Sequence, residues 1–206
     1  MRVWGRTTSS NVMKVVWLLE ELGLPYERVD VGGPFGRTGD PEYRAMNPNG
    51  TVPTLQDGDF TLWESNVILR YLCAAKAPEC SFWPADHQQR ANVDRWMDWQ
   101  QTTLNRPQSV VFQGLVRTAP EQRDTGAIEA ALVEAGRAWS LLDAQLVLRA
   151  YVAGPNLTLA DMALGVHVHR WFSFTVQRPE TPRLKAWYER LLTRPAYRAH
   201  CAAPMS

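Results

Sequence analysis

The sequence predicts a small α/β domain, residues 1–77, followed by an all-helical domain, residues 86–206. Up to residue 77, short apolar strand candidates alternate with helix candidates, whereas beyond residue 86 nearly every apolar pattern has helical spacing. Between the two parts lies a stretch rich in turn-forming residues, Pro78 to Pro84, which is typical of a linker. The 206 residues suffice for two such domains, and the hydrophobic fraction of 45% is ordinary for a chain that buries a core.

The first domain is expected to follow the order strand, helix, strand, helix, strand, strand, helix. The candidates are a strand over residues 2–5, a helix over 11–22, a strand over 26–31, a short helix after Pro41, hairpin strands over 52–56 and 60–63, and a helix over 65–75. The Asp57-Gly58 pair between two apolar segments is typical of a hairpin turn. This order suits a small mixed sheet covered by helices.

Five helix candidates make up the second domain, over residues 86–103, 127–146, 158–172, 182–192 and 195–201. The third begins at Thr158 and has Asp161 three residues later, which is the spacing of a capping box. We assign this pair to folding and stability rather than to catalysis. No internal repeat or low-complexity segment interrupts the helical pattern.

The charge balance gives no electrostatic reason to expect nucleic acid or an anionic membrane as a partner. Lysine and arginine total 22 against 21 acidic residues. No apolar run approaches the roughly 18 residues that a membrane span needs, and the N-terminus lacks the apolar core of a secretory signal. We therefore expect a cytoplasmic protein that binds neither nucleic acid nor a membrane.

The chain offers no pattern for a metal or redox-active cysteine site. The three cysteines, Cys73, Cys80 and Cys201, have no metal-binding or CxxC spacing, which indicates incidental thiols in a reducing cytosol. His167 and His169 are two residues apart on a predicted helix and so lie about 200° apart around its axis. They cannot easily share a metal, and no metal cofactor is expected.

Two short motifs near the predicted hairpin suit a small zwitterionic peptide. Pro53 cannot donate to a β-ladder, so it is expected at an edge or a cis turn that exposes the backbone of Val52. Exposed strand backbone can pair with an extended peptide. Ser65 is a plausible N-cap of the next helix, whose N-terminus attracts a carboxylate, and Glu64 could bind an ammonium. An ordinary hairpin followed by an ordinary cap is the alternative interpretation.

The segment that carries these motifs, NPNGTVPTLQDGDFTLWES at residues 47–65, resembles the glutathione-binding half of cytosolic glutathione transferases of the serine-using type, bacterial, phi-like or theta-like. The resemblance implies a thioredoxin-like first domain and a cis bond before Pro53. It also implies that the backbone of Val52 pairs with the cysteinyl unit and that Glu64 and Ser65 hold the γ-glutamyl group. The sequence LTLAD at residues 157–161 and the long helix over 86–103 extend the resemblance over almost the whole chain. A homodimer is implied as well.

The group that activates the thiol is expected at the start of the first helix. The thiol of glutathione resembles a free cysteine with a pKa of about 8.5, and a hydroxyl donor at a helix N-terminus stabilises the thiolate. Similarity to phi-like members selects Ser9, whereas theta-like spacing, counted back from Lys14, selects Ser10. Asn11 and Thr8 remain further candidates, and at least one of these residues caps the helix.

Two absences from the first domain narrow the mechanism. No tyrosine precedes Tyr26, which argues against a tyrosine-type transferase. No cysteine precedes Cys73, which removes the nucleophile of cysteine-type relatives and disfavours thiol–disulfide exchange by the enzyme.

The electrophile is expected to bind between the two domains in an apolar-aromatic pocket. Candidate lining residues come from two helices of the second domain, namely Trp99, Thr103, Arg106 and Trp171. Arg37, in the glycine-rich loop, could reach the glycine carboxylate of glutathione or could be a solvated loop residue.

These expectations together predict a glutathione transferase that conjugates the glutathione thiolate to small hydrophobic electrophiles. Peroxide reduction, dehalogenation, isomerisation and ether cleavage begin with the same thiolate, so the first-domain motifs do not separate them. A glutathione-binding protein without catalysis is the alternative from a different class.

Overall fold

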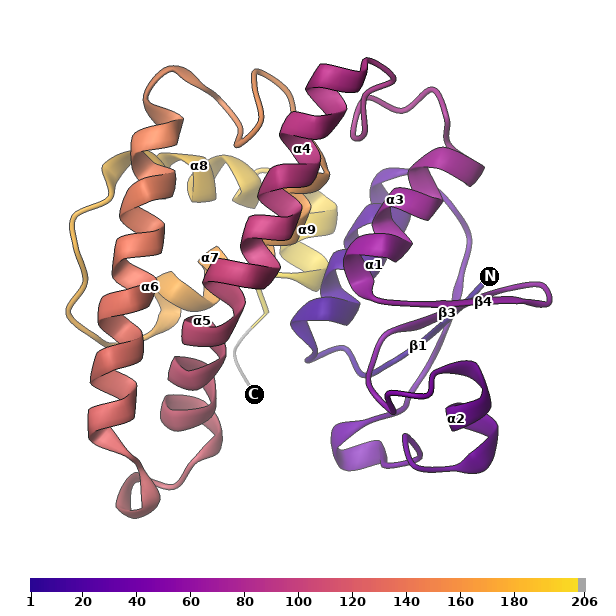
Figure 1. Ribbon diagram of the computed structural model, residues 1–206, viewed down its shortest axis with the longest axis horizontal. Coiled ribbons are helices and arrows are strands. Elements are labelled where there is room, and N and C mark those ends of the chain that lie inside the picture. The colour runs from indigo at the N-terminus through magenta and orange to yellow at the C-terminus, as the bar shows by residue number, and fades with distance from the viewer. Residues whose placement is uncertain (204–206) are drawn as a thin grey trace.

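The computed structural model describes residues 1–203, which form two domains that lie side by side (Figure 1). The first domain contains the strands β1 (Arg2–Trp4), β2 (Glu27–Val29), β3 (Thr54–Asp57) and β4 (Phe60–Trp63). They form one mixed sheet in the order β2-β1-β3-β4. Strand β1 runs parallel to β2 and antiparallel to β3, and β3 runs antiparallel to β4. The thioredoxin-like arrangement is confirmed.

The helices of the first domain are α1 (Ser10–Glu21), α2 (Pro41–Met46) and α3 (Ser65–Lys76). Helices α1 and α3 cover one side of the sheet, and α2 lies on the other side (Figure 1). Val3 lies opposite Leu55 in the β1–β3 ladder, and both side chains are fully buried in the core with residues of α1 and α3. The sheet thereby fixes the N-terminus of α1, which directly follows the loop after β1.

The second domain is a bundle of helices: α4 (His87–Trp99), α5 (Asn105–Phe112), α6 (Thr125–Gln145), α7 (Leu159–Ser173), α8 (Pro182–Leu192) and α9 (Pro195–His200). Helix α7 packs against α4, α5 and α8 and is buried along most of its length. It begins with the capping box of Thr158 and Asp161 that the sequence predicts. Within residues 1–203, no helix combines the length and apolar character needed to span a bilayer.

Helix α5 was not expected from the sequence, which predicts a helix only as far as residue 103. A π-helical turn, Gln100–Leu104, instead continues the chain from α4 into α5, and a second one, Gln113–Arg117, follows α5. Pro107 would interrupt a regular helix because it lacks an N–H and its ring crowds the preceding turn. Here it lies in the first turn of α5, directly after the widened π turn, where that cost is reduced.

Contacts of α1 with α7 and α9 join the two domains. The ring of Trp17 on α1 packs edge-on against Tyr197, with 4.8 Å between ring centroids, and the Tyr197 hydroxyl donates to the carbonyl oxygen of Gly165 at 2.8 Å. A Cβ on Gly165 would lie 2.9 Å from the Trp17 ring and 3.1 Å from Leu191. The missing side chain at position 165 therefore permits the close approach of α1 and α7.

Candidate active site

The N-terminus of α1 presents two serine hydroxyls to the space between the domains. Ser9 is the N-cap, with extended backbone, and its side chain makes no capping hydrogen bond. Its carbonyl oxygen accepts from the Met13 N–H at 2.9 Å, so the backbone alone starts the helix. Ser10 is the first helical residue, and no acidic residue occupies the first turn. A hydroxyl in this position can donate to an anion that the helix dipole also favours.

The turn at Val52 lies directly beside the loop that leads into α1. The Val52–Pro53 peptide bond is cis, as expected. A Cβ on Gly5 would lie 3.2 Å from the Cβ of Val52 and 2.4 Å from a methyl group of Val12, so only glycine allows this approach. Gly5 also has a φ of +155°. The Val52 backbone is thus held next to the N-terminus of α1.

Glu64 and Ser65 form the start of α3, with one difference from the expectation. Glu64, not Ser65, is the N-cap, because its carbonyl oxygen accepts from the N–H groups of Val67 and Ile68 at 3.0 and 2.9 Å. Glu64 is exposed and has a φ of +71°, a conformation that non-glycine residues rarely adopt. Such outliers persist at functional sites. Ser65 is buried, and its hydroxyl donates to Oδ1 of Asn11 at 3.2 Å, which joins the starts of α1 and α3.

Behind these residues lies a buried polar network centred on Lys14. The Lys14 ammonium donates to Oε1 of Gln100 at 2.8 Å and to Oδ1 of Asn66 at 3.4 Å. Nε2 of Gln100 lies 3.1 Å from Nε2 of His167 on α7. Burial lowers the pKa of Lys14 to about 7, and the carboxylate of Glu64 partly opposes that shift. The network connects α1 and α3 to the second domain, and no short motif in the sequence predicts it because its members are far apart in the chain.

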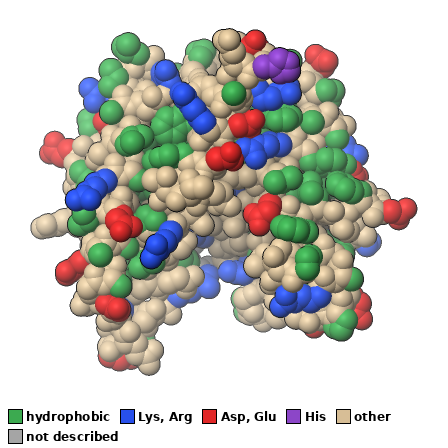
Figure 2. All heavy atoms as spheres, viewed as in Figure 1, with side chains coloured by type: hydrophobic (Ala, Val, Ile, Leu, Met, Phe, Trp, Pro, Cys, Tyr) green, Lys and Arg blue, Asp and Glu red, His purple; other side chains and the backbone are tan. Residues whose placement is uncertain are grey.

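Ser9 and Ser10 border a cavity of about 120 Å³ between the two domains. Its lining comes from the loop before α1, from α5 and the turn after it, and from α7. The lining residues are Arg6, Thr8, Ser9, Ser10, Gln108, Ser109, Phe112, Gln113, Arg117, His167 and Arg170. In Figure 2 a hollow separates the lower parts of the two domains, and Lys and Arg side chains gather around it.

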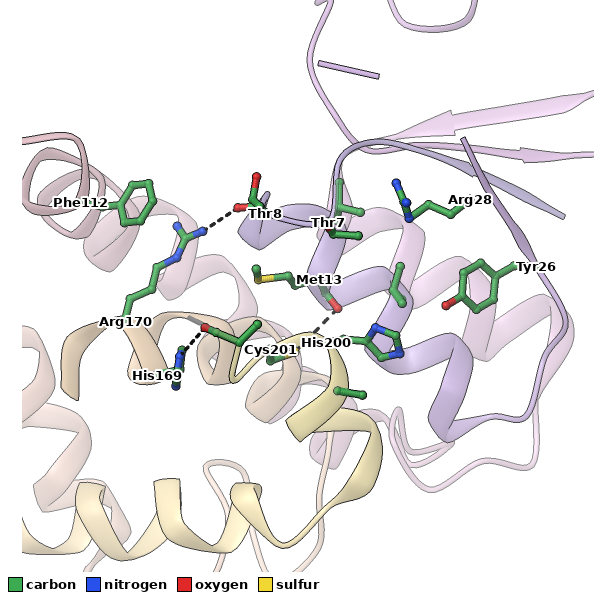
Figure 3. Close-up of a pocket in the computed structure, with 14 residues that line it drawn as sticks. Thr7, Thr8, Met13, Tyr26, Arg28, Phe112, His169, Arg170, His200 and Cys201 are labelled. Atoms are coloured by element: carbon green, nitrogen blue, oxygen red, sulfur yellow. Dashed lines mark hydrogen bonds between the residues drawn. The ribbon is translucent and has the colours of Figure 1, made fainter. Parts of the chain in front are cut away.

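Arg170 spans the domain boundary at this cavity. Its Nη2 donates to the carbonyl oxygen of Thr8 at 3.0 Å, and its guanidinium lies over the ring of Phe112, 4.1 Å from the centroid. Figure 3 shows the three residues together, at the edge of an adjoining hollow of about 160 Å³ that α1 and the C-terminal part of the chain enclose. Burial, together with the charges of Arg117 and Arg6, lowers the pKa of Arg170 to about 10.

Comparison with known proteins assigns the chain to a family. The models for the glutathione S-transferase N-terminal and C-terminal domains match residues 1–74 and 125–190. The chain belongs to the glutathione S-transferase family. It is 41% identical to glutathione S-transferase GstB of Escherichia coli over 206 residues, which cover 99% of both chains. It is 33% identical to the probable glutathione S-transferase GSTF2 of Oryza sativa, over 95% of this chain and 93% of the relative.

A solved structure of similar fold is the theta class glutathione S-transferase of Xanthomonas axonopodis pv. citri with glutathione bound. It shares 44% identity with this transferase at a TM-score of 0.95, and the match covers 100% of this chain and 98% of the other. Among residues 1–203 of this transferase, no three His, Cys, Asp or Glu side chains gather in a way that could hold a metal ion.

The structure places the four predicted pocket residues of the transferase away from this cavity. Trp99 is half-buried against Trp96, with 5.3 Å between ring centroids, while Thr103 and Arg106 are exposed. Trp171 is 1% exposed and lies in the core near Trp139. None of the four is among the described residues that line the cavity.

The cavity lies farther along the chain because α5 continues past Pro107. Gln108 and Phe112 are four residues apart on one face of α5 and both line it. The sequence shows this four-residue spacing, but it predicts a shared helix face only if a helix continues past Pro107. The lining is also more polar than the apolar-aromatic pocket that was expected, with Phe112 as its aromatic residue.

Arg37 lies in a different hollow of the transferase, which Trp4 and Tyr43 also line. It is exposed and has a φ of +67°, and its Nε lies 3.9 Å from Oδ2 of Asp40. Its contact with the glycine carboxylate of glutathione stays a prediction.

The stability of the transferase is expected to depend on pH through Lys14. Folding lowers the pKa of this residue from 10.5 to about 7, so between these values the unfolded chain binds more protons there than the folded protein. The contribution of Lys14 to the free energy of unfolding therefore rises with pH across that window, by on the order of 3 kcal/mol. Urea denaturation of wild type and Lys14→Met at pH 7, 8.5 and 10 measures this as a rising difference between the two proteins. A difference that stays constant or falls with pH contradicts the prediction.

Proposed function

We propose that this transferase binds glutathione along the edge of the first domain and conjugates its thiolate to a small electrophile held in the interdomain cavity. The observation that carries the proposal is the placement of the Ser9 hydroxyl. It stands at the N-terminus of α1, makes no capping bond, and borders the cavity. Val52 and the Glu64–Ser65 pair, expected to bind glutathione, lie beside the same helix start.

In this mechanism the binding motifs place the thiol at the N-terminus of α1. The γ-glutamyl ammonium binds the exposed Glu64, the γ-glutamyl carboxylate binds the start of α3 at Ser65, and the cysteinyl backbone pairs with Val52. Ser9 then donates a hydrogen bond to the sulfur. Lowering the thiol pKa by two units requires about 2.7 kcal/mol of preferential stabilisation of the thiolate. Proximity to the bound electrophile supplies the rest of the rate gain, without a covalent enzyme intermediate.

The geometry supports Ser9 and Ser10 over Asn11 as the activating residue. Both serines line the cavity, whereas Asn11 does not. Between the two serines we favour Ser9. Ser9 is the residue just before the first turn of α1, so it lies beside the backbone N–H groups of that turn, which have no partner within the helix.

The test is a titration of the purified protein with glutathione at neutral pH, followed by the ultraviolet absorbance of the thiolate. A saturable signal supports binding together with activation. Binding in a calorimeter without that signal indicates a binding protein without catalysis, and no binding at all rejects the proposal. Peroxide reduction and dehalogenation would share the thiolate signal, and comparison of turnover with peroxides and with halogenated electrophiles separates them from conjugation.

Replacing Ser65 with alanine is expected to weaken glutathione binding by roughly tenfold to a hundredfold, seen as a higher KM for glutathione. In the glutathione complex the Ser65 hydroxyl is expected to turn from Oδ1 of Asn11 to the γ-glutamyl carboxylate. A hydrogen bond to a charged group contributes about 1.5–3 kcal/mol, and tenfold corresponds to about 1.4 kcal/mol. Ser140→Ala on α6, far from this region, is the matched control and should leave KM unchanged. An unchanged KM in Ser65→Ala, with a normal melting temperature, would remove Ser65 from the binding site.

We also propose that the transferase is a cytoplasmic homodimer. Phe60, Trp63 and Val67, on β4 and α3, are large apolar side chains that are each more than a third exposed. Hydrophobic side chains gather over this part of the first domain in Figure 2. An exposed apolar patch of this kind is typical of an interaction surface. Sedimentation equilibrium at micromolar concentration measures the mass, and a strictly monomeric protein contradicts the proposal.

A further inference from the structure

The interdomain cavity contains a buried amide whose orientation is fixed by its neighbour. The indole N–H of Trp139 donates to Oε1 of Gln108 at 3.2 Å. Because an indole nitrogen can only donate, the oxygen of Gln108 must face Trp139 and its NH₂ group must face away. Gln108 is 1% exposed, and its Nε2 has no hydrogen-bond partner among the described residues. The cavity therefore contains an unused amide donor.

A second buried donor follows from the Lys14 network. A backbone carbonyl can only accept, so Nδ2 of Asn66 faces the Met97 carbonyl at 3.0 Å and also donates to Oε1 of Gln100 at 3.4 Å. Oε1 of Gln100 is therefore the acceptor for Asn66 and Lys14, and Nε2 of Gln100 donates to Nε2 of His167. Burial, with Lys14 nearby, lowers the pKa of His167 well below 6.5, so the imidazole is neutral. Its proton then resides on Nδ1. His167 is 2% exposed and lines the cavity, and Nδ1 has no partner among the described residues.

Positive charge surrounds these two donors. Arg6, Arg117 and Arg170 line the cavity, and its described lining includes no Asp or Glu. Nε of Arg6 is buried and also has no partner among the described residues. The guanidinium groups lie close enough that the charge of Arg117 lowers the pKa of both Arg6 and Arg170. A buried donor without an acceptor raises the free energy of the folded protein. A bound anion would accept from these donors and would also balance the positive charge of the arginines.

We propose that the electrophile of this transferase carries a carboxylate, which binds in the cavity between Arg6 and Arg170 and accepts from the buried N–H groups of Gln108 and His167. The inference rests on the proposed function, and it replaces the expected hydrophobic electrophile with an anionic one. Because Ser9 borders the same cavity, a carboxylate bound there holds the rest of the electrophile, with its carbon–halogen bond, near the glutathione sulfur. In a displacement on a carbon–halogen bond, the sulfur–carbon bond forms, the halide leaves with the bonding electrons, and the thiol proton goes to solvent.

The test compares two electrophiles that differ only in charge, a chlorodinitrobenzoate with chlorine para to the carboxylate and the matching benzamide. The kcat/KM for each, at saturating glutathione, is divided by the rate constant of its uncatalysed reaction with glutathione. We expect the normalised value to be at least tenfold larger for the carboxylate. Arg6→Gln and Arg170→Gln should each lower kcat/KM for the carboxylate by roughly tenfold to a hundredfold, and change that for the amide less than about threefold.

Controls separate this inference from the proposed function. Arg137→Gln, on an exposed face of α6, should affect neither substrate. Dinitrobenzoate without the chlorine should inhibit competitively against the electrophile and weakly or not at all against glutathione. Arg6→Gln keeps the test valid if the more buried Arg170→Gln does not fold. A thiolate signal with equal normalised rates for the two substrates overturns the anionic electrophile while the transferase function stands. Competition of dinitrobenzoate with glutathione also overturns it, because the donors would then serve glutathione itself.

Discussion

Replacement of Asp161 with alanine is expected to lower the free energy of unfolding by about 3–5 kcal/mol. The carboxylate is fully buried and accepts hydrogen bonds from the Val152 N–H, from the N–H and hydroxyl of Thr158, and from the indole of Trp187, at 2.8 to 3.0 Å. It thus joins the start of α7 to the preceding loop and to α8. Alanine leaves these donors unpaired in the core, and each unpaired donor costs about 1–3 kcal/mol.

Urea denaturation at neutral pH measures this loss. Asp98→Ala is a matched control, because Asp98 is an exposed residue whose carboxylate pairs with Arg70 at 2.9 Å. That surface pair is expected to contribute less than about 1 kcal/mol. If the two substitutions cost the same, the buried hydrogen bonds of Asp161 do not hold the second domain together.

Replacement of Ser9 with alanine is expected to lower kcat by roughly tenfold to a hundredfold and to change the affinity for glutathione by less than about threefold. The variant loses a charge-assisted hydrogen bond worth about 1.5–3 kcal/mol to the thiolate, and each 1.36 kcal/mol is tenfold in rate. The pKa of the bound thiol should rise by about 1–2 units for the same reason. The pH dependence of the thiolate absorbance measures this pKa directly.

Ser10→Ala is the matched control for this prediction, since Ser10 borders the same cavity one residue farther along. We expect it to retain most of the activity. Full turnover in Ser9→Ala together with a large loss in Ser10→Ala assigns the role to Ser10. Full turnover in both variants moves it to Asn11 or to the backbone N–H groups of α1.

Much of the fold was predictable because its signals are local. The Asp57-Gly58 turn, the pairing of Thr158 with Asp161, and the helical spacing after residue 86 each act over a few residues. The α5 helix was missed because a proline at position 107 ordinarily ends a helix, and a π-helical turn is not visible in an apolar pattern.

In the candidate site, too, the features set by short motifs were predictable and those set by distant residues were not. The cis bond before Pro53 and the exposed Glu64 belong to short motifs that the sequence displays. The N–H donors of Gln108 and His167 in the cavity belong to no such motif, because their orientation depends on residues far away in the chain. Gln108 is oriented by Trp139, which is 31 residues away. His167 is oriented through Gln100, which is 67 residues away.

The contact of Trp17 with Gly165 sets the distance between α1 and α7, although neither residue lines the interdomain cavity. Trp17 lies on the helix that begins after Ser9, and Gly165 lies five residues before Arg170 on α7. One added methyl group at position 165 would push the indole ring and shift α1 against α7. The sulfur site and Arg6 would move with α1, whereas His167 and Arg170 of the carboxylate site would move with α7. A single substitution at this contact, away from the cavity, would thus change the distance between the two parts of the site. The length of electrophile that fits would change, although no residue that contacts the electrophile is substituted.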